Sequence, residues 1–427
     1  MNNLLLKNAM VVSPGDNLKE ELDILIKDDK IKKIAKDISD SKAEKVVDLT
    51  GKIVTPGFID LHVHLREPGF THKEDLVTGT KAAAKGGFTT VVAMPNTNPI
   101  IDKAPLVNSI LTKAKEKAVV NVEQIGAITQ NSQGHKLAEI GLMKEAGIVA
   151  ISDDGRSVMD AEVMRLGLKY AKNFDLPVMV HCEDENLAAD GVVHEGYYST
   201  ITGLGAIPAT AENVIVARDI YLAEETGAKL HIAHISTKEA VDLVRQAKAR
   251  GVDVTCEVTP HHFCLTAEAI TNYDTDTKVN PPLRAKEDVA AIKAGLKDGT
   301  IDAIATDHAP HAREEKEQEY DLAPFGISGL ETAFALVNQE LIQAGILSLE
   351  EAIAKLTIEP AKILGKQEKM LEPGSKADLT VADLEQEWTV KPEEFYSKGK
   401  NTPFKGEKLT GDIAMTIVSG EIVYTRR

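Results

Sequence analysis

The chain is short of cysteine and of positive charge, and both shortages limit what the protein can be. Only three cysteines occur among 427 residues. They are too few and too irregularly spaced for a disulfide framework or a zinc knuckle, and they suit a reducing compartment as buried neutral thiols. The 49 Lys and Arg residues are outnumbered by 66 Asp and Glu residues, which gives a formal net charge of −17. Because this charge repels phosphate groups, we expect neither a nucleic-acid partner nor binding to an acidic membrane.

Long hydrophobic runs are missing as well. No run approaches the roughly 18 apolar residues that a membrane-spanning helix needs. The N-terminal stretch from Met1 to Lys7 is too short for the apolar part of a signal peptide, and no basic region precedes it. With 43% hydrophobic and 27% charged residues, the composition is that of an ordinary globular protein. We therefore expect a soluble protein of the cytoplasm.

The middle of the chain, from about residue 55 to about residue 365, repeats a short apolar run followed by a helical stretch. The runs are mostly continuous, as expected of parallel strands buried on both faces. Capping boxes are predicted at Ser236 with Glu239 and at Ser348 with Glu351. Eight such units predict an α/β fold, a (β/α)₈ TIM barrel. A doubly wound open sheet is the alternative, but it normally has fewer strands, and no G-x-G-x-x-G or Walker pattern begins any of the expected helices. The runs begin at residues 57, 90, 120, 148, 177, 230, 252 and 301.

The two ends of the chain have a different pattern from the middle. Short strands and turns are predicted over about the first fifty residues, with runs at 22–26 and 31–34, and over 377–381 and 413–424 near the C-terminus. We expect both ends to pair into one small β-module. The expected boundaries are 1–54 for its N-terminal part, 55–365 for the barrel and 366–427 for its C-terminal part.

Histidine is concentrated where such a barrel carries its active site. In parallel barrels the functional side chains follow the C-terminal ends of the strands. Of the twelve histidines, only His72, His135 and His194 lie away from these predicted positions. A random scatter would not produce this distribution, so the group predicts a functional site. Its members are His62, His64, His181, His231, His234, His261, His262, His308 and His311.

The pattern of these histidines is typical of a metal site. His62 and His64, two residues apart on one predicted strand, point to the same face and can hold one ion. His181 and His234 come from neighbouring strand ends and can hold a second. Zinc accepts imidazole nitrogen and carboxylate oxygen while it keeps a position open for water.

Carboxylates complete the predicted site. Two cations need an anionic ligand between them, and Asp153 and Asp154 both lie at the end of the fourth strand. Only one of these two neighbours can face the ions, because adjacent side chains point in opposite directions. Asp307, at the end of the eighth strand, is placed to take and return a proton. Arg66 lies beside the metal histidines, and its guanidinium can bind a substrate carboxylate through two parallel hydrogen bonds.

An ordered series of motifs resembles the amidohydrolase superfamily and, more narrowly, the longer bacterial (class I) dihydroorotases of pyrimidine biosynthesis. The resemblance covers almost the whole chain, and the terminal strands resemble that superfamily's composite β-sandwich. Pro373-Gly374 and Ala377-Asp378 resemble the segment by which the chain of that superfamily re-enters the β-sandwich after the barrel. The other motifs are His62-x-His64-x-Arg66-x-Pro68-Gly69, Met94-Pro95-Asn96-Thr97, Asp153-Asp154-Gly155, His181-Cys182-Glu183-Asp184, Asn280-Pro281-Pro282-Leu283-Arg284 and Thr306-Asp307-His308-Ala309-Pro310-His311.

The resemblance implies a zinc-dependent hydrolase of a cyclic amide that interconverts dihydroorotate and N-carbamoyl-L-aspartate. A hydroxide held by the metals would attack the ring amide, and Asp307 would carry the proton to the departing nitrogen. Two zinc ions per subunit are implied, with Asp154 as the bridge. The implied ligands are His62, His64, Asp154 and Asp307 for one ion, and Asp154, His181 and His234 for the other. The implied substrate contacts are His64, Arg66, Asn96, Asn280, His311 and the backbone of Phe325 and Gly326.

Two alternative functions fit the sequence less well. Hydantoinases and allantoinases are similar in fold but bridge their metals with a carboxylated lysine, whereas the fourth strand here leads into Ser152-Asp153-Asp154. A catalytically inactive dihydroorotase-like partner of aspartate transcarbamoylase would have lost metal ligands, and this chain keeps them all. The family suggests a homodimer and leaves a complex with that transferase open. His261 and His262 are expected to support the site, and residues 312–324 resemble a loop that closes over substrate.

Overall fold

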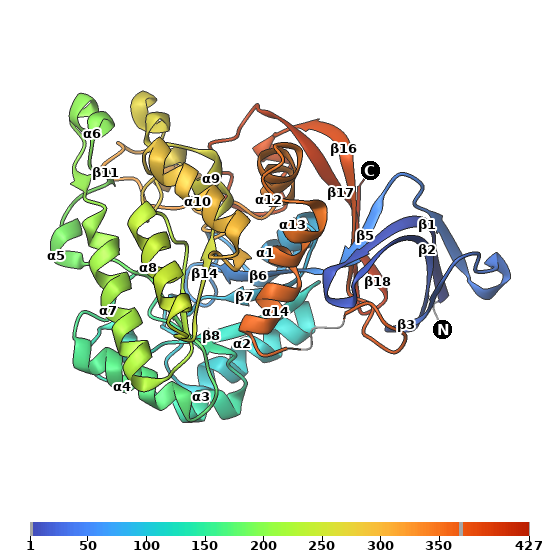
Figure 1. Cartoon of the computed structure of the whole chain (residues 1–427), viewed down its shortest axis with the longest axis horizontal. Helices are drawn as coiled ribbons and strands as arrows, with labels where there is room; N and C mark the ends of the chain where they lie inside the picture. Colours follow the sequence, from blue (N-terminus) through green and yellow to red (C-terminus); the bar gives the residue numbers. More distant parts are fainter. Residues whose placement is uncertain (1–2, 367–369, 427) are drawn as a thin grey trace.

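The computed structural model describes residues 3–366 and 370–426, and it divides into a barrel and a β-module (Figure 1). Eight parallel strands form the barrel sheet in the order β15-β14-β13-β10-β9-β8-β7-β6. A parallel bridge between Val63 and His308 joins the two ends of this sheet. The predicted (β/α)₈ barrel is confirmed. Its strands are β6 (Phe58–Val63), β7 (Phe88–Ala93), β8 (Asn121–Gly126), β9 (Ala150–Ile151), β10 (Val178–Val180), β13 (Leu230–Ile232), β14 (Val254–Val258) and β15 (Ala303–Ile304).

Burial on both faces explains why these strands appear as continuous apolar runs in the sequence. All six residues of β6 and all six of β7 are buried. Helices cover the outside of the barrel (Figure 1). The longer ones are α1 (Leu76–Lys85), α2 (Ala104–Lys117), α3 (Ile140–Ala146), α4 (Ala161–Lys172), α7 (Thr210–Thr226), α8 (Lys238–Ala249), α10 (Lys286–Asp298) and α13 (Leu349–Leu356).

Shorter elements build the loops around the barrel. The helices among them are α5 (Glu185–Ala188), α6 (Tyr197–Thr202), α9 (Pro260–Cys264), α11 (Arg313–Lys316), α12 (Ala333–Val337) and α14 (Ile358–Ile363). Two short strands, β11 (Val193–His194) and β12 (Ala206–Ile207), pair with each other. Short stretches of 3₁₀ or π helix are η1 (Pro14–Asp16), η2 (Asp40–Lys42), η3 (Gln130–Ser132), η4 (Ala267–Asn272), η5 (Thr275–Thr277), η6 (Asn338–Gln343) and η7 (Pro392–Glu394). None of the described helices is long and apolar enough to cross a membrane.

One of the two predicted capping boxes is confirmed and the other is wrong. At α13, the Ser348 hydroxyl accepts from the Glu351 backbone N–H at 3.2 Å, and the Glu351 carboxylate accepts from the Ser348 N–H at 2.7 Å. At α8 the N-cap is Thr237, whose hydroxyl accepts from Ala240 N–H at 3.1 Å. Ser236 instead binds the buried side chains next to it: its N–H and hydroxyl donate to the Glu212 carboxylate of α7, and its hydroxyl accepts from Arg284 Nε at 2.9 Å.

The β-module is built from both ends of the chain, as predicted. Its strands follow the order β18-β17-β16-β5-β1-β2-β3, with β4 paired to β1. The two ends join where β5 and β16 pair antiparallel, and apolar side chains from both arms pack into one core that includes Leu6, Ile24 and Ile417. The strands are β1 (Asn3–Ser13), β2 (Leu18–Lys27), β3 (Lys30–Ala35), β4 (Lys45–Asp48), β5 (Ile53–Pro56), β16 (Leu379–Thr389), β17 (Lys408–Val418) and β18 (Glu421–Thr425).

Candidate metal centre

Asp154 lies at the centre of the histidine cluster, just beyond β9. Its Oδ1 is 3.3 Å from His62 Nε2 and 3.7 Å from His234 Nε2, and its Oδ2 is 3.5 Å from His64 Nε2. Two groups of potential metal ligands share this carboxylate. In each group the ligand atoms lie within 4.8 Å of one another, and every member is buried. The groups are His62, His64 and Asp154, and Asp154, His181 and His234.

The choice between Asp153 and Asp154 is decided by side-chain direction. Asp153 Oδ1 accepts from the backbone N–H groups of Ile128 at 2.8 Å and Thr129 at 3.1 Å, and Asp153 Oδ2 accepts from the Thr129 hydroxyl. Asp153 therefore fixes the loop after β8 and does not face the histidines. Asp154 is the carboxylate that the two histidine groups share.

Several buried polar atoms of this cluster lack partners, and this favours a bound cation. Each has no hydrogen-bond partner among the described residues, although such atoms are nearly always paired in folded proteins. Imidazole nitrogen together with carboxylate oxygen is a donor set that suits zinc. The residues thus fit a metal centre. The unpartnered atoms are His62 Nε2, Asp154 Oδ1, His181 Nε2 and His234 Nδ1.

A second layer of side chains fixes the orientation of the first. His62 Nδ1 is 2.9 Å from Glu257 Oε1, and His64 Nδ1 is 2.9 Å from Asn96 Oδ1. The amide of Asn96 also donates to Asp154 Oδ2 at 3.1 Å. Partners of this kind select the tautomer and orientation of a metal-binding imidazole. In this structure Asn96, which was predicted to contact substrate, therefore joins two of the predicted ligands.

Glu257 was missed by the sequence analysis, and it has a strongly perturbed pKa. Burial alone would raise this pKa, but hydrogen bonds from His231 and His62 outweigh the effect and lower it to about 2. His231 Nε2 lies 3.2 Å from Glu257 Oε2. The only local signal was a carboxylate inside the apolar strand β14, where a buried charge requires a partner.

Asp307 follows β15 and faces both histidines of β6. Its Oδ1 lies 3.0 Å from His64 Nε2 and 3.5 Å from His62 Nε2. Burial would raise its pKa, but the His62 charge and a hydrogen bond from His64 hold the pKa well below the ordinary range. The backbone of Asp307 has φ +46°, a conformation that costs energy for a non-glycine residue and is often found at functional sites. Asp307 is therefore a carboxylate at neutral pH.

A cavity of about 150 Å³ joins the metal cluster to the residues predicted to bind substrate. Its wall includes Arg66, Asn280 and the Phe325–Gly326 segment, opposite the predicted metal ligands. Arg66 is half-buried, and its partial burial lowers its pKa to about 10, so that it stays charged at neutral pH. The full lining is His64, Arg66, Asn96, Asp154, Gly155, His181, His234, Asn280, Asp307, Ala309, Phe325 and Gly326.

Three predicted residues lie next to this cavity without lining it. His62 is fully buried behind it. His311 contacts Arg66, with 3.1 Å between His311 Nε2 and Arg66 Nη2, and lines a neighbouring cavity of about 610 Å³. His262 Nε2 lies 2.9 Å from the Pro281 carbonyl oxygen, next to Asn280, which agrees with the supporting role predicted for it.

Comparisons with known proteins give consistent results. Residues 51–240 match a family described as dihydro-orotase-like, and residues 287–424 match the amidohydrolase family. The chain is 55% identical over 424 residues to a dihydroorotase of Pelotomaculum thermopropionicum, with 99% of each chain covered. It is 51% identical over 424 residues to a dihydroorotase of Geotalea daltonii, covering 99% of this chain and 100% of that one. Among solved structures, the L-hydantoinase (dihydropyrimidinase) of Arthrobacter aurescens has a TM-score of 0.89 at 28% identity, covering 100% of this chain and 96% of that one.

Proposed function

Because the chain belongs to the dihydroorotase family of amidohydrolases, we propose that it interconverts dihydroorotate and N-carbamoyl-L-aspartate, a step of pyrimidine biosynthesis that runs toward ring closure in the cell. The observation that carries this proposal is one small cavity whose wall includes most of the metal cluster and the half-buried Arg66. Both compounds carry a carboxylate that stays intact while the amide is made or broken. A guanidinium next to a metal centre can bind this carboxylate while the metal acts on the amide.

The proposed cofactor is a pair of zinc ions. One would be held by His62, His64, Asp154 and Asp307, and the other by Asp154, His181 and His234. Bound zinc polarises an amide carbonyl and lowers the pKa of water. The sharing of Asp154 between the two ligand groups, and the unpartnered atoms within them, support two ions in preference to one.

Asp307 is the proposed catalytic acid and base. It is ionised at neutral pH, as its lowered pKa requires, so it can take a proton from the attacking water. In the hydrolytic direction it returns this proton to the ring nitrogen as the C–N bond breaks. Ring closure uses the same steps in reverse. Proton transfer by a well-placed side chain contributes about 10²–10⁴-fold to a rate.

The remaining cavity residues are proposed to select the substrate. Arg66 takes the carboxylate, supported by His311 and Asn96. Asn280, whose Oδ1 is buried and has no partner among the described residues, is available to the ring, together with the backbone of Phe325 and Gly326. His64 also faces the substrate, because it lines the cavity.

A hydantoinase-like activity is the second candidate, and it rests on the solved structures that this fold resembles. Two observations oppose it. No lysine is among the described residues that line the cavity, and the shared bridging position is Asp154. Arg66 in the cavity wall has no evident purpose for a substrate without a carboxylate.

Metal analysis combined with turnover measurements tests the proposal. The purified protein should hold two zinc ions per chain and interconvert the two compounds in both directions, with hydantoin and allantoin as control substrates. Asp154→Asn should lose zinc and activity. The matched variant Asp153→Asn should keep its zinc, because that side chain binds only the neighbouring loop. Full zinc content without turnover in either direction, or a preference for hydantoin, would contradict the proposal.

We also propose that the protein is a cytoplasmic homodimer. Family resemblance supports this assembly and makes aspartate transcarbamoylase a candidate partner. Sedimentation analysis of the protein alone, and then with that transferase, distinguishes a monomer, a dimer and a mixed complex.

A further inference from the structure

His311 has an unusual set of neighbours, with two groups at each ring nitrogen. At Nε2 these are the Phe325 carbonyl oxygen, 2.8 Å away, and Arg66 Nη2, 3.1 Å away. At Nδ1 they are Lys73 Nζ and Glu315 Oε2, both at 3.4 Å. Each nitrogen therefore faces one hydrogen-bond donor and one acceptor.

A neutral imidazole can satisfy only two of these four groups at once, because it has one N–H and one lone pair. With the proton on Nε2, the ring donates to Phe325 and accepts from Lys73 at Nδ1. With the proton on Nδ1, it donates to Glu315 and accepts from Arg66 at Nε2. In the second state the ring engages the guanidinium, whereas in the first state the guanidinium is free for a substrate. The tautomer of His311 thus decides whether Arg66 is available.

The geometry favours the first state. At Nε2 the 2.8 Å contact with the Phe325 carbonyl favours an N–H, and the Arg66 donor at 3.1 Å favours a lone pair, so the Lys73 donor at Nδ1 tips the balance toward the proton on Nε2. Glu315 Oε2 already accepts from the Ala312 N–H at 3.0 Å, at the start of α11. The doubly protonated ring is excluded at neutral pH, because burial and the charges of Arg66 and Lys73 lower the pKa of His311 to about 2.

Lys73 is held in place by Glu315 of α11. Its ammonium pairs with Glu315 Oε1 at 2.9 Å, and the two side chains are only 17% and 26% exposed. This contact joins the loop after β6 to α11, which are distant in the sequence. Glu315 thus anchors Lys73 beside the imidazole and fixes α11 with its second oxygen.

We propose that Lys73 is a positioning residue of the substrate-carboxylate site: held by Glu315, it donates to Nδ1 of His311, fixes the Nε2–H tautomer and so leaves the Arg66 guanidinium free for the carboxylate. The inference rests on the proposed function, which makes Arg66 the carboxylate ligand. It assigns a role to a residue that neither the motif series nor the metal cluster includes.

Nitrogen-15 NMR of the histidine rings tests the tautomer without any activity measurement. The wild-type spectrum should show Nε2 of His311 protonated, with its signals assigned by their loss in His311→Asn. Lys73→Met should move the proton to Nδ1, since only Glu315 then faces that nitrogen. Glu315→Gln should keep the proton on Nε2, because Lys73 remains. If Lys73 served only to hold the loop through its ion pair with Glu315, the Lys73→Met and Glu315→Gln variants should give the same spectrum. That result would overturn the proposal.

Kinetics provide the second readout. Lys73→Met should raise the KM for dihydroorotate about 10-fold, the size of effect expected from weakening one hydrogen bond to a charged group, and should change kcat little. In an Arg66→Ala background the same substitution should add almost nothing, because both act through one guanidinium. The matched control is Lys293→Met, which breaks the remote ion pair with Glu340 (3.0 Å, 24% and 31% exposed) and should leave KM unchanged.

The two proposals fail separately. If the wild type does not turn over dihydroorotate, the proposed function fails and the NMR result still tests the tautomer. If the wild type is active, but Lys73→Met changes neither the tautomer nor KM, this inference alone is wrong.

Discussion

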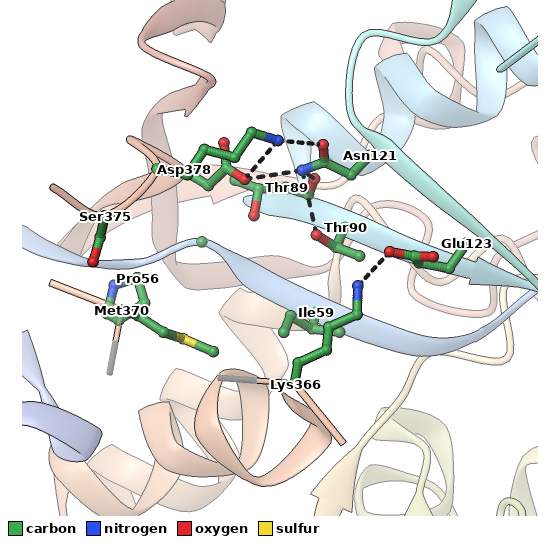
Figure 2. Close-up of a pocket in the computed structure, with 12 residues that line it drawn as sticks. Pro56, Ile59, Thr89, Thr90, Asn121, Glu123, Lys366, Met370, Ser375 and Asp378 are labelled. Carbon is green, nitrogen blue, oxygen red and sulfur yellow. Dashed lines mark hydrogen bonds and ion pairs between the residues drawn. The ribbon is translucent and has the colours of Figure 1, made fainter. Parts of the chain in front are cut away.

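Both ends of the barrel contain a polar cavity, but the two are organised in opposite ways. The cavity at the N-terminal end lies between the first barrel strands and the C-terminal stretch that enters the β-module, and at about 350 Å³ it exceeds the 150 Å³ of the metal centre. In Figure 2 its polar side chains bind one another. Asn121 donates to Asp378 at 3.0 Å and accepts from Lys376 at 2.8 Å, and Lys366 pairs with Glu123.

The size of a cavity therefore does not indicate which end of the barrel is functional. The presence of buried polar atoms without hydrogen-bond partners does. At the N-terminal end opposite charges neutralise each other, and only the Ser375 hydroxyl is a buried polar atom without a partner among the described lining residues. At the C-terminal end four predicted metal ligands each have such an atom. Polar groups that satisfy one another's hydrogen bonds stabilise the fold. Buried polar groups without partners require a bound ligand to supply them.

Among the substitutions that compare the two ends of the barrel, Asp307→Asn should have the largest effect on activity. The amide has nearly the same size but cannot take a proton, so kcat should fall by about 10²–10⁴-fold. The free energy of unfolding should fall as well, because an ionised carboxylate whose pKa is held below its ordinary range by His62 and His64 stabilises the fold at neutral pH. Initial rates in both directions and urea unfolding measure the two quantities. A kcat within tenfold of the wild type would mean that another group moves the proton.

Arg66→Ala should have the next largest effect. Loss of the half-buried guanidinium, which is proposed to bind the substrate carboxylate through two hydrogen bonds, should raise KM by about 10²–10³-fold. The change in kcat should be smaller, because the metal ligands and Asp307 are untouched. Competition by orotate, which carries the same carboxylate, measures the loss directly. Unchanged affinity for orotate would refute the role of Arg66.

At the other end of the barrel, Asn121→Ala should affect stability alone. The amide donates to Asp378 and to the Thr89 carbonyl at 2.8 Å, and it accepts from Lys376. Removing these contacts should lower the free energy of unfolding by about 1–3 kcal/mol. The values of kcat and KM should stay within twofold. A tenfold loss of turnover with an intact fold would show that the two ends are coupled, and the comparison would fail.

The parts of the fold that can be predicted from the sequence are those marked by a local pattern of residues. The barrel strands were recognisable because burial on both faces makes each one a continuous apolar run, and the metal histidines because they follow those runs. Strand β1 lies within the predicted β-rich N-terminal region but was not delimited there, although it has three neighbours in the β-module. Its pairing with β2 shifts register between Leu6 and Ala9, where Asn8 has φ +57°, and its other neighbours, β4 and β5, are set by non-local pairing.

Within the site, the sequence predicted residue types better than side-chain directions. The choice between Asp153 and Asp154 needed the family pattern, because only the fold shows that Thr129 binds the first. Lys73 carries no signal of its own, and Glu257 only that of a carboxylate within an apolar strand, since their partners His311 and His62 lie 238 and 195 residues away. Contacts of this kind arise from the closure of the barrel and the placement of its loops.

Lysines at the two ends should differ in their effect on the pH dependence of stability. Lys316 is buried and donates to the carbonyl oxygens of Pro324 at 2.9 Å and Gly326 at 3.3 Å. Burial lowers its pKa to about 8, with Lys278 acting in the same direction and Asp276 and Asp274 opposing it. Between pH 8 and the ordinary pKa of 10.5 the unfolded chain therefore binds more protons than the folded one.

The sign of the effect follows from this difference in bound protons. As the pH rises from 8 to 10, the wild type should gain about 1–2 kcal/mol of stability relative to Lys316→Met, which lacks the titrating group. Urea unfolding at matched pH values measures the gain. Lys366→Met, at the other end, is the control and should show no such slope. Parallel curves for wild type and Lys316→Met would mean that water reaches the ammonium.

The smallest effect is expected from the ion pair of Lys366 with Glu123, whose side chains are 34% and 26% exposed. Solvent screens such a pair, so Lys366→Ala should cost only about 0.2–1 kcal/mol of unfolding free energy, and 1 M salt should remove most of the difference. A double-mutant cycle with Glu123→Ala isolates the pairwise energy. A coupling well above 1 kcal/mol that persists in salt would mean that this cavity is less hydrated than its exposure indicates. Its charges would then stabilise the junction of barrel and β-module as strongly as the buried contacts of Asn121.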